Sequence, residues 1–498
     1  MQRQEKWRVK DKEYTFTGYP AQAVEDWNAI PEEFEEAHCL DFYGGDLQGM
    51  EKKIPYLQEL GVNGIYLNPI FSAATVHKYD CIDYFHVDKH LGGDLAFADF
   101  MQALHEQDMR LILDISINHT GSGHKWFNAE GFYEDMHGAY ADTEAKEREY
   151  YYFEEDGSYG CYGNLPSLPK LNYHSEELRN ILYKGEDSVL RKWLKSPYQI
   201  DGWRFDVAAT TGQYKLDHFE HEIWPEIRSA IKETKPDAYI LAEDWNDGYD
   251  FLQGNEWDGI MNFFGCGRPV RDYVGQLDFR HGRNKKLKQT LPNTSGKALA
   301  ERILSFFGKL PYVIQESQFN MLDCHDISRL HNHSEISFSQ YEMAVYLMYI
   351  LPGAVCIYYG DEIGLDGRLG SAEGCRYPMN WEEKYKENRY FQLYQSMNLE
   401  RKQSEALQYG GFKILVAENK VFVCARFTKD EVYLVVTSME QEKTEEVVLN
   451  LKIFGDCFQM PEMDRMGREL RYSSFGDGKV KLEVPPFRGY FIRLKNCF

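Results

Sequence analysis

The sequence predicts an α/β protein whose core is a (β/α)8 barrel of the TIM type, followed by a C-terminal antiparallel β-sandwich. Two observations lead to this prediction. Between residues 60 and 360, short β-prone runs alternate with longer segments of helical period, which is typical of a parallel sheet built from βα units. After about residue 395 the β-prone runs follow one another closely and are joined by polar turns, as in a sandwich.

Seven of the β-prone runs can form barrel strands, and an eighth is needed to close the barrel. The only upstream candidate for it is residues 13–19. In the helical windows between the runs, apolar residues such as Leu60, Phe100 and Trp193 recur where they can face the sheet. The seven runs are residues 63–68, 110–117, 200–206, 238–243, 257–262, 319–323 and 354–359.

The breaks in this alternation predict the domains. We assign the barrel to residues 1–119 and 176–394. Residues 120–175 are rich in Tyr, Gly, Glu and Asp, and we predict that they form an inserted domain, because loops this long in compact domains are usually functional excursions. Residues 395–498 are assigned to the C-terminal sandwich, with strand candidates at 412–417, 420–427, 431–436 and 445–451.

Charge and cysteine content narrow the classes of partner and compartment. The 498 residues include 79 acidic and 56 basic side chains, a formal net charge of −23. Such a surface repels phosphate backbones and anionic membranes, so we expect neither nucleic acid nor membrane as a partner. The ten cysteines form no Cys-x-x-Cys pair, and the N-terminus has no apolar signal region. We therefore expect a reducing, cytoplasmic location.

Three carboxylates, Asp206, Glu243 and Asp326, each follow a predicted strand. The carboxyl ends of barrel strands hold the active site, so we expect the three to meet there. Cleaving a glycosidic bond with retained stereochemistry needs one carboxylate as nucleophile and a second as acid and base. Each residue alone is most simply a solvated strand-end carboxylate, but their joint appearance at successive strand ends favours the catalytic interpretation.

Arg204 and Asp206 lie two residues apart on one predicted strand, so their side chains face the same side. The permanent positive charge of Arg204 would favour the ionised form of Asp206, the natural nucleophile. Glu243, after the next strand, would then serve as the acid and base.

Other polar residues near the strand ends are candidate ligands. His119 and His325 offer neutral donors for sugar hydroxyls, although a lone histidine is more often structural. His77 and Tyr79 form a wall of the site or are simply loop residues. Asn118 suits Ca²⁺ ligation, with no other cofactor required, or a purely hydrogen-bonded brace for the inserted domain. The chain lacks Gly-x-Ser-x-Gly and Gly-x-x-x-x-Gly-Lys-Ser/Thr, which disfavours a serine hydrolase or a nucleotide-binding enzyme.

Six motifs occur in order at residues 61–71, 114–119, 168–172, 202–206, 241–245 and 322–326, among them Gly-Trp-Arg-Phe-Asp, Leu-Ala-Glu-Asp-Trp and Leu-Asp-Cys-His-Asp. Together they resemble the α-amylase superfamily of glycoside hydrolases. The segments Leu-Pro-Lys-Leu-Asn, His-Lys-Tyr-Asp and Gly-Gly-Asp-Leu-Gln-Gly are most similar to the branch that holds neopullulanase, cyclomaltodextrinase and maltogenic amylase.

The resemblance implies a retaining α-glucan hydrolase with Asp206 as nucleophile, Glu243 as proton donor and Asp326 as the carboxylate that stabilises the transition state. The implied substrates are maltodextrins, cyclomaltodextrins, starch or pullulan, cleaved at α-1,4 and in part at α-1,6 bonds. Two alternatives stay open: transglycosylation of the same substrates, and a non-catalytic, glucan-binding member of the fold. The oligomeric state is not predicted.

The same resemblance implies a set of substrate-binding residues. Trp245 would lie near the leaving-group side, and Arg376 would act at an outer subsite. The residues implied around the sugar whose bond is cut are Arg204, His119, His325 and Tyr79, with His77 beside them.

Overall fold

The computed structural model describes residues 15–276, 292–381, 384–456 and 458–496. The chain divides into two compact units. The first comprises Met1–Asp244 and Gly248–Ile260, and the second comprises Trp245–Asp247 and Met261–Phe498. The first unit holds the first part of the βα alternation. The second holds the remainder and the C-terminal strands.

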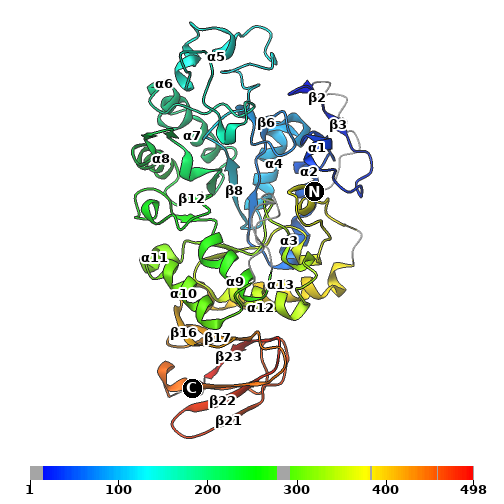
Figure 1. Cartoon of the computed structure of the whole chain (residues 1–498), viewed down its shortest axis with the longest axis vertical. Coiled ribbons are helices and arrows are strands. Elements are labelled where there is room, and N and C mark those ends of the chain that lie inside the picture. Colours follow the sequence, from blue (N-terminus) through cyan, green and yellow to red (C-terminus); the bar gives the residue numbers. More distant parts are fainter. Residues whose placement is uncertain (1–14, 277–291, 382–383, 457, 497–498) are drawn as a thin grey trace. The chain divides into compact units, whose positions relative to one another are not determined.

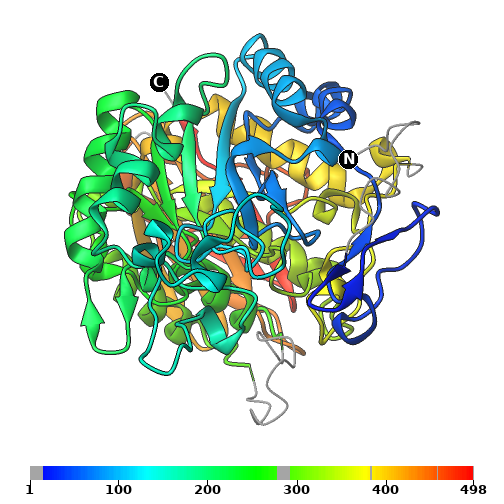
Figure 2. The same ribbon diagram turned by 90° about the horizontal axis from the view of Figure 1, so that it is seen from above.

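A five-stranded parallel sheet with the order β13-β12-β9-β8-β5 forms the centre of the first unit (Figure 2). Between its strands along the chain come helices such as α4 and α8 (Figure 1). Apolar side chains on one face of these helices, such as Phe100 on α4 and Ile227 on α8, are fully buried, and removing such surface from water holds helix to sheet. The strands are β5 (Gly64–Leu67), β8 (Arg110–Ile115), β9 (Gly202–Phe205), β12 (Tyr239–Ala242) and β13 (Gly259–Ile260); the main helices are α2 (Leu47–Glu51), α3 (Ile54–Leu60), α4 (Gly93–His105), α7 (Val189–Leu194) and α8 (Glu220–Thr234).

The barrel strand predicted at residues 13–19 is wrong for the part that the structure describes. There β1 (Thr15–Phe16) pairs antiparallel with β2 (Tyr19–Pro20) in a tight hairpin. The two turn residues, Thr17 and Gly18, have φ values of 50° and 88°, as a two-residue hairpin turn requires. The chain therefore turns back where a barrel strand would continue.

The strand that comes directly before helices α2 and α3 is β4 (Asp41–Phe42), which pairs in parallel with β3 (Gln22–Ala23). It is only two residues long. A strand this short leaves no recognisable alternation in the sequence, which is why the prediction missed it.

Between β8 and α6 (Glu176–Arg179), residues 120–175 form a long excursion that is mostly loop. Phe127 is fully buried within it, and its ring centroid lies 4.8 Å from that of Tyr151 and 4.8 Å from that of Tyr159. Aromatic packing thus gives the excursion a small core of its own. A bridge between His119 and Lys170 ties its end to the residues that follow β8. It contains the short helix α5 (Gly138–Ala141).

The second unit holds the last two predicted barrel strands, β14 (Phe319–Met321) and β15 (Ala354–Cys356), paired in parallel. Met261, directly after β13, forms a parallel bridge with Phe319. The helices of this part are α9 (Arg268–Tyr273), α10 (Gly296–Phe307), α11 (Tyr312–Gln315), α12 (Phe338–Ile350), α13 (Arg389–Gln403) and α14 (Glu405–Tyr409).

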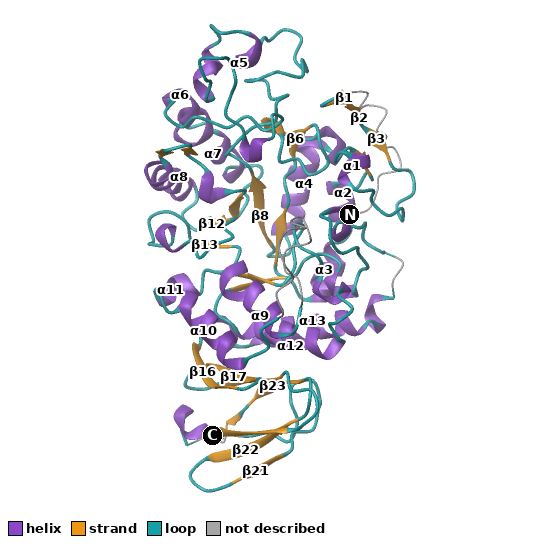
Figure 3. Ribbon diagram, in the orientation of Figure 1, coloured by secondary structure: helices purple, strands orange, loops and turns teal. Residues whose placement is uncertain are grey.

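The C-terminal strands form two antiparallel sheets, with orders β16-β17-β18-β23 and β19-β22-β21 (Figure 3). Apolar residues from both sheets, such as Leu434 and Leu482, belong to one buried core, as expected for a sandwich. The strands are β16 (Gly411–Glu418), β17 (Val421–Phe427), β18 (Val432–Ser438), β19 (Glu445–Asn450), β21 (Tyr472–Ser474), β22 (Lys479–Val484) and β23 (Arg488–Arg493). Within the described ranges, no helix combines the length and apolarity needed to cross a membrane.

Candidate active site

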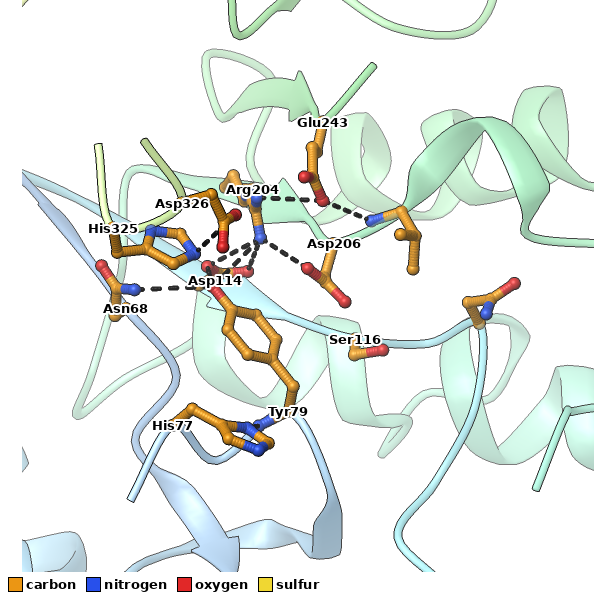
Figure 4. Close-up of polar contacts among 12 residues, drawn as sticks. Asn68, His77, Tyr79, Asp114, Ser116, Arg204, Asp206, Glu243, His325 and Asp326 are labelled. Carbon is orange, nitrogen blue, oxygen red and sulfur yellow. Dashed lines mark hydrogen bonds and ion pairs between the residues drawn. The ribbon is translucent and has the colours of Figure 1, made fainter. Parts of the chain in front are cut away.

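The guanidinium of Arg204 forms the centre of a buried charged cluster (Figure 4). Its Nη1 donates to both carboxylate oxygens of Asp114, at 2.9 Å each, and to Oδ1 of Asp206 at 3.0 Å. Its Nη2 lies 3.1 Å from Oε2 of Glu243. The side chains of Arg204 and Asp114 have no exposed surface. One cation therefore joins three carboxyl groups.

The sheet register brings these groups together. Asp114 on β8 is the direct neighbour of Arg204 on β9. Asp206 lies two residues beyond Arg204, so its side chain leaves the chain on the same side. Glu243 directly follows β12, the next strand of the sheet. The carboxyl ends of three neighbouring parallel strands thus supply the cluster.

The protonation of Asp206 depends on three influences. Burial raises its pKa well above the ordinary value, and the nearby Glu243 carboxylate raises it further. The Arg204 guanidinium acts in the opposite direction, because it stabilises the ionised form. The raised pKa means that Asp206 holds its proton to a higher pH than an isolated carboxyl group does, and Arg204 limits this rise. One ionised and one protonated carboxyl group side by side can perform acid-assisted nucleophilic attack.

The turn after β9 directs a backbone donor at Glu243. Val207 adopts φ 43° and ψ 40°, a left-handed conformation that is costly for a β-branched residue. In this conformation its N–H donates to Oε2 of Glu243 at 2.9 Å. The same carboxylate oxygen is therefore held by Val207 and by Arg204, which limits its freedom to rotate.

Two tyrosines complete the environment of Asp114. The hydroxyls of Tyr66 and Tyr79 donate to its Oδ2 at 2.7 and 2.9 Å. Asn68 Nδ2 in turn donates to the Tyr79 hydroxyl at 3.4 Å. Of these residues the sequence prediction named Tyr79, and the structure joins it to the Arg204 cluster through Asp114.

The loop that carries His77 and Tyr79 is anchored by the residues between and after them. Lys78 forms a buried ion pair with Asp88, with 2.5 Å between Nζ and Oδ2. Asp80 is buried as well, and burial raises its pKa to about 6. The rings of His77 and Tyr79 stack with centroids 5.8 Å apart. Buried anchors thus alternate with half-buried rings along this loop.

His119 is buried and has local partners. Its ring nitrogens lie 3.0 Å from Asn118 Nδ2 and 3.3 Å from Ser116 Oγ. The ring of Tyr162, from the excursion, stacks on it with centroids 5.1 Å apart and planes inclined by 10°. Burial and the charge of Lys170 lower the pKa of His119 to about 3, so the imidazole is neutral at physiological pH.

Asn118 was predicted either to ligate calcium or to brace the inserted segment. Its Oδ1 accepts hydrogen bonds from the Lys170 ammonium and from Thr210 Oγ1. The same ammonium donates to the Thr210 carbonyl at 2.9 Å, and burial lowers the pKa of Lys170 to about 8. The Lys170 ammonium thus occupies the position beside the Asn118 oxygen that a bound metal ion would need. These residues fit a brace and do not fit a calcium ion.

The remaining predicted residues belong to the second unit. His325 Nε2 lies 3.3 Å from Oδ2 of Asp326. Arg376 donates from Nε to the His325 carbonyl at 2.9 Å, and its Nη2 lies 3.4 Å from Oδ1 of Asp326. Arg376, predicted as a substrate contact, thus also holds the segment that carries Asp326.

Trp245 lies on the loop after β12. Its ring stacks on Phe263, with centroids 4.1 Å apart and planes inclined by 4°, and the Arg268 guanidinium lies 5.5 Å from the ring. These two contacts hold the indole of Trp245 in one orientation.

Two residues of the cluster were missed as site residues, Asp114 and Tyr66. Asp114 lies within a recognised motif, but only the strand register shows that it pairs with Arg204. A buried arginine needs more than one acceptor. That requirement could have indicated that Arg204 has a carboxylate partner besides Asp206. For Tyr66, no feature of the sequence indicates a role in the site.

Comparison with known proteins agrees with this geometry. Residues 28–403 match the family model for the α-amylase catalytic domain. The chain belongs to the α-amylase family. It is thus a glycoside hydrolase of a family that acts with retention, as the motifs predicted, and the family fold is the predicted (β/α)8 barrel with a C-terminal antiparallel domain.

Relatives within the family come from the predicted branch. A cyclomaltodextrinase of Geobacillus thermopakistaniensis is 30% identical over 85% of this chain and 67% of its own length. An intracellular maltogenic amylase of Bacillus subtilis is 31% identical over 82% of this chain and 64% of its own. The chain therefore spans about two thirds of these relatives. The solved structure of Ttha1563 from Thermus thermophilus matches with a TM-score of 0.77, at 28% identity over 95% of this chain and 94% of that one.

Proposed function

We propose that this protein hydrolyses α-1,4-glucosidic bonds in short linear or cyclic α-glucans, with retention and through a covalent glycosyl-enzyme intermediate. The observation that carries the proposal is the shared guanidinium of Arg204, which binds Asp206 and Glu243 at the ends of adjacent parallel strands. The names of the relatives, cyclomaltodextrinase and maltogenic amylase, support this substrate class. Acceptance of α-1,6 bonds, as in pullulan, belongs to the proposal as well.

In this mechanism each carboxyl group has one task. Asp206 attacks the anomeric carbon while Glu243 protonates the leaving oxygen. Glu243, now ionised, takes a proton from water, and the resulting attack on the anomeric carbon releases the sugar from Asp206. Asp326, which the motif order matches to the third carboxylate of the family, stabilises the charge that develops on the sugar.

The other predicted residues act in binding. Tyr79 and His77 form one wall, and His119, whose imidazole is neutral, and His325 donate to hydroxyls. Trp245 offers a platform on the leaving-group side, and Arg376 acts at an outer subsite. We also place the protein in a reducing cytoplasm. In support, none of the eight cysteines in the described part of the chain forms a disulfide, and one relative is named intracellular.

The decisive experiment identifies the nucleophile directly. The protein is incubated with a fluorinated maltosyl fluoride, whose glycosyl-enzyme intermediate is slow to hydrolyse, and the labelled peptide is sequenced by mass spectrometry. The proposal requires the label on Asp206 and its loss in Asp206→Asn. A label on another residue, or none with folded protein across the pH range, would contradict it.

Product analysis then separates hydrolysis from transfer. Maltoheptaose, γ-cyclodextrin and pullulan are each digested, and products are followed by chromatography at rising substrate concentration. Hydrolysis gives short maltooligosaccharides throughout. Products longer than the starting maltoheptaose would favour transglycosylation, and absence of any product would favour a glucan-binding protein.

A further inference from the structure

Three consecutive residues after β14 carry three different metal-binding groups. The Cys324 thiol, the His325 imidazole and the Asp326 carboxylate each offer one ligand atom, and these atoms all lie within 4.8 Å of one another. The His325 nitrogen and the Asp326 oxygen are already 3.3 Å apart. Cys324 Sγ accepts from the Asp326 N–H at 3.4 Å, so the thiol lies on the same side of this turn.

The donor set matches a borderline-soft divalent cation. Thiolate, imidazole and carboxylate bind Zn²⁺ at roughly 2.0–2.3 Å, which places neighbouring ligand atoms of a tetrahedral site roughly 3.5 Å apart. The pair of His325 and Asp326 already has this spacing. The thiol is at most 4.8 Å from the other two ligand atoms, so bringing it to this spacing needs a shift of about 1.3 Å at most, within reach of side-chain rotation. The fourth position would be filled by water, as in many three-ligand zinc sites.

Burial and exposure are compatible with entry of an ion. Cys324 and His325 are 2% and 7% exposed, while the side chain of Asp326 keeps 23% of its surface. The Arg376 guanidinium faces the other carboxylate oxygen, Oδ1, at 3.4 Å. Its positive charge opposes a second cation, so we expect moderate affinity and reversible binding.

A second group of potential ligands serves as a comparison. Asp323, His331 and Asp361 also have ligand atoms close together. There, however, Arg271 forms an ion pair with Asp323 and Arg329 forms one with Asp361. Two guanidinium groups already neutralise these carboxylates, so we assign no metal to them.

We propose that Cys324, His325 and Asp326 form an inhibitory site for a thiophilic divalent cation such as Zn²⁺. Binding replaces the thiol proton of Cys324 with the metal and releases that proton to solvent. It also ties Asp326 to the metal and removes it from the sugar. The inhibitory consequence rests on the proposed function of Asp326, whereas the binding itself does not.

Binding is tested with Cd²⁺ added to the purified full-length protein, because a cadmium-thiolate bond gives an ultraviolet charge-transfer absorption. The wild type is expected to gain this band and to lose it on addition of excess chelator. Cys324→Ser, which keeps an oxygen acceptor for the Asp326 N–H, is expected to weaken binding by more than about tenfold. Cys161→Ser, which removes a half-buried thiol in the excursion, is the matched control and should behave like the wild type.

Inhibition is measured in the same proteins with Zn²⁺ and maltoheptaose. The concentration for half inhibition should rise more than about tenfold in Cys324→Ser and stay unchanged in Cys161→Ser. If Cys324→Ser does not fold, as judged by its thermal transition, Cys324→Ala takes its place and His325→Gln provides the second ligand change.

The outcomes separate the two proposals. A cadmium band that persists undiminished in the Cys324 and His325 variants overturns the metal site. A band that depends on Cys324 in a protein without activity on any glucan supports the metal site and overturns the proposed function. Zinc inhibition equal in wild type and Cys324→Ser overturns the inhibitory role.

Discussion

The guanidinium of Arg204 contacts three carboxyl groups and has no exposed surface. Its charge opposes the rise in the pKa of Asp206 that burial and Glu243 cause. Arg204 therefore acts on the protonation of the proposed nucleophile, and a change there should appear first in the pH profile.

Arg204→Met should move the acidic limb of the kcat/KM profile to higher pH. Without the cation, the pKa of Asp206 rises further, so less nucleophile is ionised at a given pH; an opposite charge at this distance shifts a pKa by about 1–3 units. Arg204→Lys keeps the charge and should shift the limb less. The profile is measured on maltoheptaose with variants whose thermal transitions show that they are folded. An unchanged limb in Arg204→Met would contradict the assigned role.

Glu243→Gln should lower kcat on maltoheptaose by about 10²–10⁴-fold, because the amide cannot protonate the leaving oxygen. An aryl maltoside with a good leaving group needs no such proton, so its first step should be nearly normal and the intermediate should accumulate as a burst. Asp206→Asn should show no burst with the same substrate. Equal losses of Glu243→Gln on both substrates would argue against Glu243 as the acid.

At the scale of elements, the site depends on loops that are fixed by buried charges. Asp80, next to Tyr79, accepts hydrogen bonds from the Thr75 N–H and hydroxyl. Burial raises its pKa from 3.8 to about 6, so the folded chain holds this proton where the unfolded chain has released it. Its contribution to stability is complete below about pH 4 and is lost as the pH rises through 6.

In the wild type, the unfolding free energy should fall between about pH 4 and 6, and Asp80 accounts for at most about 3 kcal/mol of this fall. Asp80→Asn should therefore make the unfolding free energy nearly independent of pH in this range. Urea unfolding at a series of pH values measures it. Asp83 is the control: burial raises its pKa, but hydrogen bonds and nearby cations outweigh burial and leave it below the ordinary value. Asp83→Asn should keep the slope, and a slope that survives in Asp80→Asn would disprove the assignment.

The Lys170 brace connects the excursion to the end of β8. If the Lys170 ammonium takes the place of a metal ion at Asn118, EDTA should leave the melting temperature of the protein unchanged. Lys170→Met leaves the oxygens of Asn118 and Thr210 without this donor and should lower the unfolding free energy by about 1–3 kcal/mol. A melting temperature that falls in EDTA and recovers with Ca²⁺ would contradict this account.

The elements and residues that could be predicted are those determined by a local pattern in the sequence. The strands around Arg204 and Glu243 are apolar runs with a polar residue at the end, and a run of this kind can be recognised from the sequence alone. The two-residue β4 and the hairpin turn at Thr17 have no such run. Asp114 and Lys170 depend on partners about 90 and 50 residues away in the chain, as the strand register and the brace show, so only the folded structure could reveal their contacts.

At the scale of the whole molecule, the C-terminal sandwich stabilises the second unit. Helix α12 is buried over 11 of its 13 residues and packs against β18 and β23. Arg468 pairs with Glu342 on this helix, and the Tyr273 hydroxyl donates to the Lys420 carbonyl at 3.0 Å. A helix that is apolar on nearly every side needs such cover.

A chain truncated after Tyr409 should therefore aggregate on expression, because α12 loses the surface that covers it. Soluble yield and the thermal transition of the truncated chain, compared with the full chain, measure this. A soluble, cooperatively melting fragment would show that the sandwich is dispensable for folding.

The shared guanidinium has one further consequence, in the charge that the cluster presents. Asp114, Asp206 and Glu243 offer three acidic groups to a single arginine. Three carboxyl groups against one guanidinium give this buried cluster an excess of acidic groups. A glucosyl ring that is losing its leaving group becomes positive, so these preformed negative charges interact more strongly with the short-lived cation than with the neutral sugar that precedes it.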